Sequence, residues 1–203
     1  MNKGVSTYKE LDIINDIRGK VISHGERTGI NLFLMFGYIS FLVFLTEFVA
    51  LQLWHTNLCE WLWAVIPIIG VPLLVYFIRK DFYRTGRRTL NENIALNLWI
   101  FIGCASAVSG FITGLTGVYE LCYCLIQGLL VSMGCFLTGV IVRFRPMVAC
   151  GIVGAMMSFL CLFFQGEQWP WQLFIMTLII TITLIVPGHF YRSHIIKERN
   201  EFV

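Results

Sequence analysis

Long apolar stretches separated by short polar segments dominate the chain from residue 31 onward. The hydrocarbon layer of a bilayer is about 30 Å thick, so a helix that rises 1.5 Å per residue needs roughly 20 apolar residues to cross it. On this basis we predict six membrane-spanning helices, over residues 31–53, 61–78, 94–112, 121–142, 146–164 and 171–190. Their short connections arrange them as three hairpins, so the predicted fold is an all-α polytopic membrane domain over 31–190.

A shorter amphipathic pattern precedes the first apolar stretch, within residues 1–30. Leu11, Ile14 and Val21 recur at helical spacing, and Asp16 lies on the opposite face. The pattern predicts a short helix whose apolar face packs against lipid headgroups, the helical bundle or a second copy of the chain.

The distribution of cations gives the orientation. All fifteen Lys and Arg residues fall on one side of the predicted threading. Such cations stay on the cytoplasmic side of a membrane, so we expect the N-terminal segment and a tail over 191–203 to be cytoplasmic. Tryptophans favour membrane interfaces, and five of the six mark the opposite ends of the helices: Trp54, Trp61, Trp63, Trp169 and Trp171.

Composition agrees with an integral membrane protein, because 57% of the residues are hydrophobic and only 13% are charged. The net charge of +3 is explained by orientation, so we expect no nucleic-acid partner. No cleavable signal peptide is expected. The seven cysteines show no metal-binding spacing, and we expect no metal and no cofactor. Motifs for phosphate binding, zinc proteolysis and serine hydrolysis are missing, so we expect no enzyme activity.

Small residues line three of the predicted helices. In a bilayer, helices associate through close backbone packing, which small side chains permit. We expect these helices to form a tight centre or an oligomer seam, and the alternative is that their small faces line a cavity. The residues are Gly103, Ala107, Gly110, Gly114, Gly128, Ser132, Cys135, Gly151, Gly154, Ala155 and Ser158.

Acidic residues supply the first candidate site. Glu47 is the acid that the threading places well inside a helix, where a carboxylate is costly and often marks a pathway or a partner. It could instead reach water at the outer interface, or accept a bond from Thr46, Gln52 or a neighbouring helix. We also consider an outer vestibule that binds a cation, formed with Glu47 by His55, Glu60, Glu120 and Glu167. The competing interpretation is that loops without cations simply need polar residues.

Cationic residues supply the second candidate site, on the predicted cytoplasmic side. One loop concentrates cations that can contact an anionic leaflet or dock a partner: Arg79, Lys80, Arg84, Arg87 and Arg88. Arg143 and Arg145 flank a tight turn before Pro146, at the level of Pro187-Gly188-His189. Together these could bind an anion or phosphate. Alternatively, the proline and glycine end the last helix beside two arginines that extend to the interface.

Five short motifs occur in order along the chain: Leu11-x-Ile13-Ile14-x-x-Ile17, Gly37-Tyr38, Trp61-Leu62-Trp63-x-x-Ile66-Pro67-x-x-Gly70, Gly139-x-Ile141-x-Arg143-Phe144-x-Pro146 and Ile185-Val186-Pro187-Gly188-His189. With them the chain resembles small multi-pass inner-membrane proteins of Bacteroidota. The resemblance covers most of the chain and implies a Gram-negative inner membrane. It transfers no activity and no functional residue.

The sequence therefore favours a non-enzymatic inner-membrane protein that acts by binding, as a sensor, regulatory or accessory component. Its expected partners are the anionic inner leaflet, a cytoplasmic protein and further copies of itself as a homo-oligomer. The alternative is a small oligomeric transporter or channel for a cation or small solute, with the small-residue helices lining the path and Glu47 gating it.

Overall fold

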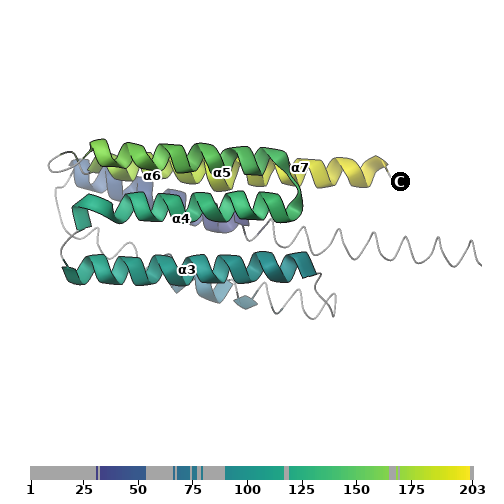
Figure 1. Ribbon diagram of the computed structural model, residues 1–203, viewed down its shortest axis with the longest axis horizontal. Helices are drawn as coiled ribbons and strands as arrows, with labels where there is room; N and C mark the ends of the chain where they lie inside the picture. The colour runs from purple at the N-terminus through teal and green to yellow at the C-terminus, as the bar shows by residue number, and fades with distance from the viewer. Residues whose placement is uncertain are drawn as a thin grey trace, which may run out of the picture.

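The computed structural model describes residues 31, 33–53, 66, 68–73, 75–76, 79, 90–116, 119–164, 168 and 170–201. These residues are almost entirely helical, and the helices lie side by side along a common axis (Figure 1). The first described helix, which we call the first span, is Phe33–Leu53. It is followed by α3 Leu90–Thr116, α4 Tyr119–Val142, α5 Arg145–Ser158, the 3₁₀ segment η2 Phe159–Phe163, α6 Pro170–Ile180, the π segment η4 Thr181–Ile185 and α7 Val186–Glu201.

Five helical stretches in the described part of the chain are long and apolar enough to cross a membrane. They are Phe33–Leu53, Asn93–Ile112, Tyr123–Val142, Arg145–Phe163 and Pro170–Lys197, which match five of the predicted spans. Of the predicted span 61–78 the structure describes only residues 66, 68–73 and 75–76, and the amphipathic helix within 1–30 lies wholly outside the described residues. The count of six helices and their arrangement as three hairpins therefore stay predictions.

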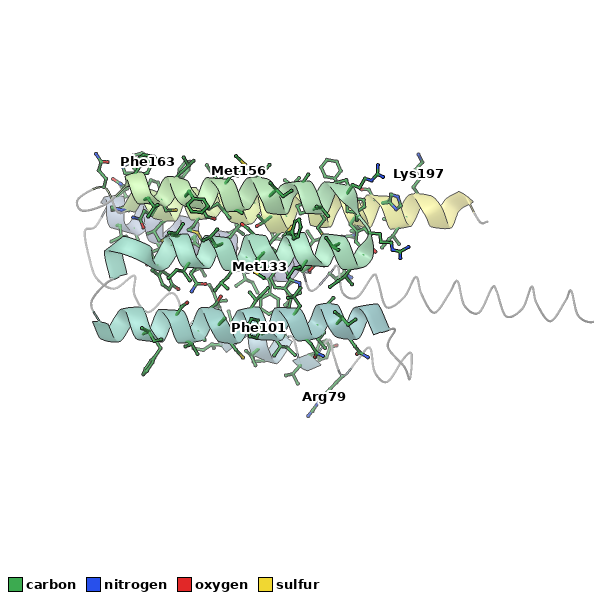
Figure 2. All side chains as sticks on the ribbon, viewed as in Figure 1. Arg79, Phe101, Met133, Met156, Phe163 and Lys197 are labelled. Carbon is green, nitrogen blue, oxygen red and sulfur yellow. The ribbon has the colours of Figure 1, made fainter. Side chains whose placement is uncertain are left out.

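Large apolar side chains cover the outside of the bundle. Phe101, Met133, Met156 and Phe163 are more than half exposed and project from α3, α4, α5 and η2 (Figure 2). Lipid solvates such side chains, whereas water does not. The exposed surface is therefore the one that a membrane-spanning bundle presents to a bilayer.

The antiparallel pair α4 and α5 is the most closely packed part of the bundle. A Cβ added to Gly151 would lie 2.6 Å from the backbone nitrogen of Phe136, and one added to Gly139 would lie 2.7 Å from that of Val148. The backbones can approach this closely only because neither glycine carries a side chain. The predicted tight centre is therefore present in α4 and α5.

The same seam continues onto η4. Gly154 of α5 packs against Thr183 of η4, and a Cβ there would lie 2.7 Å from Oγ of Ser132 on α4. The Ser132 hydroxyl is fully buried and has no conventional hydrogen-bond partner among the described residues.

The last helix does not end near Phe190, as the sequence predicted, but runs from α6 through η4 into α7. Pro187 lacks the amide that would reach back to the preceding turn. The wider π turn just before it accommodates this loss, because the amide of Val186 donates to the carbonyl of Thr181, five residues earlier. Gly188 then lets α7 approach the first span, since a Cβ there would lie 2.6 Å from Leu34.

The first span packs antiparallel against this long helix. Gly37 lies against Leu184, and the ring of Phe48 lies 5.4 Å from that of Trp171 and 5.5 Å from that of Phe174. Trp171 is partly exposed at the beginning of α6, where an interfacial indole was predicted. The other four tryptophans of that predicted belt lie outside the described residues.

Helix α3 lies at the edge of the bundle and differs from the prediction. It meets α4 through hydrogen bonds from Trp99 to Thr138, 3.0 Å long, and from Gln127 to the carbonyl of Ser106, also 3.0 Å. Nothing lies within 4 Å of a Cβ added to Gly103. The small residues of α3 therefore do not all join the tight centre, because part of their face points outward.

The described connections fall into two sets. The beginning of the first span, the α4–α5 turn and the C-terminal half of α7 lie at one end of the bundle (Figure 1). The ends of the first span, α3 and η2 lie at the other end. This is the grouping that the charge pattern predicted, although it does not by itself identify the cytoplasmic side.

Candidate functional site

Glu47 is the one member of the predicted acidic vestibule whose side chain the structure describes. Glu120 lies at the beginning of α4, but its side chain is not among those described. His55, Glu60 and Glu167 lie outside the described residues. The vestibule therefore stays a prediction, and the geometry of the acidic site is that of Glu47.

Glu47 faces the interior of the protein. Its side chain is 3% exposed, whereas Thr46 and Gln52 on the same helix are exposed. It lies on the first span between Phe44, which is buried, and Phe48, which is half-buried. The described geometry therefore places the carboxylate among packed helices and away from lipid.

One buried thiol, that of Cys124, lies near Glu47, and a second, that of Cys161, lies near the first. Cys124 of α4 interacts electrostatically with Glu47 and with Cys161 of η2. Both cysteines are almost fully buried. Among the described residues, however, no group of three His, Cys, Asp or Glu side chains lies close enough to hold a metal ion. The carboxylate and the Cys124 thiol are therefore neighbours in the core, and no such ligand set is found among the described residues.

A second buried polar side chain lies at the same end of the bundle. Gln172 of α6 is 2% exposed and donates a hydrogen bond from its amide nitrogen to the carbonyl of Phe164. This bond ties the beginning of α6 to the end of η2. Sequence reasoning missed Gln172, although an amide in the first turn of a long apolar helix is a signal that could have identified it.

The predicted cationic site begins at the turn between α4 and α5. The amide of Arg143 donates to the carbonyl of Val140, 3.2 Å, and the amide of Phe144 donates to that of Gly139, 2.9 Å. These two bonds form a Schellman motif, whose left-handed position is usually glycine. Here Arg143 occupies it with φ 58°. Pro146 lies in the first turn of α5, as predicted.

Phe144 connects this turn to α7. Its ring centroid lies 5.1 Å from that of Tyr191 and 5.7 Å from that of His194. Tyr191 is buried against Leu34 of the first span. The α4–α5 turn and the first span therefore both brace α7 at the point where it leaves the bundle.

Exposed cations surround this aromatic contact. Arg143 and Arg145 lie in the turn, and Arg192 and Lys197 lie on α7, all four exposed. We call the α4–α5 turn and α7 beyond Phe190 the cationic end. Figure 2 shows Lys197 on the part of α7 that extends past the other helices.

His189 was predicted to lie with Arg143 and Arg145, but its hydrogen-bond partner is on the first span. Its Nε2 lies 2.6 Å from the hydroxyl of Tyr38, so the ring is hydrogen-bonded to the first span. Tyr191, two residues later, faces Phe144 from another side of the helix. Of the predicted cationic loop, Arg79 is exposed and points away from the helices (Figure 2), and Lys80, Arg84, Arg87 and Arg88 lie outside the described residues.

Comparisons with known proteins add no family: no family model, no curated protein and no solved structure matches the chain. Function therefore has to be argued from Glu47 and the cationic end.

Proposed function

We propose that this chain is a non-enzymatic multi-pass membrane protein that acts as a sensor, regulatory or accessory component by binding a partner at its cationic end. The observation that carries the proposal is the projection of α7. The helical run Pro170–Lys197 has 28 residues. At 1.5 Å per residue this run is about 42 Å long, roughly 12 Å more than the hydrocarbon layer.

The part that exceeds the membrane is suited to recognition. It carries the exposed Arg192 and Lys197, and Phe144 braces it against the bundle. A helix held in a fixed direction loses little conformational entropy when a partner docks. Its charge favours a partner with an acidic surface.

The proposal includes the topology predicted from the sequence: six spans, an inner-membrane location and cytoplasmic termini. The grouping of the described cationic connections at one end supports it, because cations are retained on the cytoplasmic side. A homo-oligomer remains part of the proposal as an expectation from the sequence.

The transporter alternative is less well supported. It required the small faces of the helices to line a path, but the faces of Gly139, Gly151 and Gly154 are filled by neighbouring helices. In the described part of α4 and α5, the small-residue faces are therefore packed against other helices and do not line a path.

The test uses a photo-crosslinking amino acid in the full-length protein in its native membrane. Placed at Lys197 it should capture a cytoplasmic protein, and placed at Gln168, exposed near the other end, it should not. Charge reversal by Arg192→Glu together with Lys197→Glu should abolish capture by a crosslinker at His194, which lies between them. Unchanged capture after charge reversal, or the same captured protein from Gln168, would contradict the proposal.

A further inference from the structure

A buried acid at the end of the bundle opposite the cations has no role in the proposed partner binding. Glu47 is the one acidic side chain that the structure describes, and it is 3% exposed. Acidic side chains within membrane spans are costly and commonly serve proton or ion movement. The surroundings of Glu47 indicate whether it is better suited to bind a proton or a metal ion.

The described neighbours of Glu47 that can be named are apolar or weakly polar groups. Its own helix carries the rings of Phe44 and Phe48, and α4 contributes the thiol of Cys124, behind which lies that of Cys161 on η2. The amide of Gln172 lies at the same end, on α6. An interior of this kind accommodates a neutral carboxylic acid at far lower cost than a carboxylate anion.

A proton fits this site better than a metal ion. Metal cations need several oxygen, nitrogen or sulfur ligands around them. The described residues contain no group of three His, Cys, Asp or Glu side chains close enough to hold a metal. A proton needs only one carboxylate oxygen, to which it binds covalently, and water can supply and accept it.

The location of Glu47 also gives a route. It lies six residues before Leu53, the last residue of the first span, which corresponds to about 9 Å along the helix. Between it and that end lie the Phe48–Trp171 ring contact and the Gln172–Phe164 hydrogen bond. The adjoining η2 is a 3₁₀ segment, whose hydrogen bonds are poorer than those of an α-helix.

We propose that Glu47 is a reversible proton-binding site, loaded from the end of the bundle formed by Leu53, Phe164 and Pro170. In the loaded form one carboxyl oxygen carries the proton. Release returns the proton to water at that end and leaves a carboxylate, which requires the contacts of Phe48 and Gln172 to open. The site adds a ligand, the proton, that the proposed partner binding does not involve.

The test is infrared spectroscopy of the full-length protein reconstituted in lipid bilayers, with Glu47→Gln as the reference. The difference spectrum should contain the C=O band of a neutral carboxylic acid. This band should shift in deuterated water and should convert reversibly to carboxylate bands as the pH is raised. A difference spectrum with carboxylate bands alone at every pH, or a neutral band that never exchanges with deuterium, would overturn the proposal.

Two matched variants distinguish a proton site from a structural carboxyl group. Phe48→Ala removes part of the cover and should accelerate deuterium exchange of the Glu47 band by roughly tenfold or more, because local opening limits access. Phe163→Ala removes an exposed ring at the same end and should leave the rate unchanged. Equal rates in both variants would overturn the proposed route.

A third variant is used if size-exclusion chromatography shows that Glu47→Gln does not fold. Glu47→Asp keeps the acid, and its neutral-acid band should appear at a changed frequency with the same response to pH. A band unaffected by this substitution would assign the signal to another group and reject Glu47 as the site.

Discussion

The helix pair α4–α5 and the helix α3 are similarly apolar, yet they pack very differently. Gly151 of α5 lies against the backbone of α4, whereas Gly103 of α3 has nothing within 4 Å. Only 6% of the α3 span is buried, against 39% of the α4 span and 28% of the span that contains α5. Because lipid solvates apolar side chains as well as protein does, hydrophobicity brings a helix into the membrane, and close backbone contact decides whether it joins the core.

The sharpest test of this difference substitutes the two glycines. Gly151→Ala should destabilise the protein by about 3 kcal/mol, because the added Cβ meets backbone atoms that cannot rotate away. Gly103→Ala should change stability by less than about 0.5 kcal/mol, since it fills open space on an exposed helix face. Thermal unfolding in detergent measures both. Equal losses in the two variants would show that α3 is as tightly packed as α4–α5.

A smaller loss of stability is expected from removing the ring of Phe144, which packs α7 against the bundle. Phe144→Ala should cost about 1.5 kcal/mol by removing the contacts with Tyr191 and His194. Amide hydrogen exchange should accelerate in residues 191–197 and stay unchanged in α3. Phe163→Ala, which removes an exposed ring, is the control. Unchanged exchange in α7 after Phe144→Ala would show that the bundle does not brace the cationic end through this ring.

The turn that connects α4 to α5 allows a third test, of the backbone strain at Arg143. Arg143→Gly should stabilise the protein by about 1 kcal/mol, because a left-handed residue with a Cβ is strained and glycine is not. The neighbouring Arg145→Gly should instead destabilise it by about 1 kcal/mol, since Arg145 begins α5 with a helical backbone. Melting temperatures that move in the same direction for both variants would contradict this account of the turn.

The smallest expected effect concerns the attachment of α3. Trp99→Phe and Thr138→Val each remove the hydrogen bond between α3 and α4. A double-mutant cycle should give a coupling of about 0.6 kcal/mol, the average for interhelical bonds in membranes. A coupling of several kcal/mol would make polar contacts, and not the missing backbone contacts, the determinant of how α3 packs.

The lengths of the apolar stretches were sufficient to predict five of the spans, and Pro146 located the beginning of α5 within a residue. The end of the last helix could not be predicted. Pro187 and Gly188 are usual helix-ending residues, but here the π turn before them and the contact with Leu34 keep them within the helix. Likewise, Gly103 and Gly151 lie in similar local sequences, and only the tertiary arrangement determines which one meets a neighbour.

The candidate sites were predicted in part. Glu47 was identified because a carboxylate inside an apolar helix is conspicuous, but periodicity alone does not say which helix it faces. The contacts of Phe144 with α7 escaped prediction because they join segments far apart in the chain. Gln172 bonds to Phe164, only eight residues away, and was missed although an amide in the first turn of an apolar helix is visible in the sequence. Arg143 and Arg145 were predicted as a pair, and the left-handed conformation of Arg143 was not.

The sidedness of the cationic end is the claim on which the proposed function depends. Single cysteines at Arg145, Lys197 and Gln168 can be tested with a membrane-impermeant maleimide, with the parent protein as background for its native cysteines. The first two should react only when the cytoplasmic side is opened, and the third should react from the outside of intact spheroplasts. Reaction of the first two from the outside, or from opposite sides of the membrane, would contradict the account.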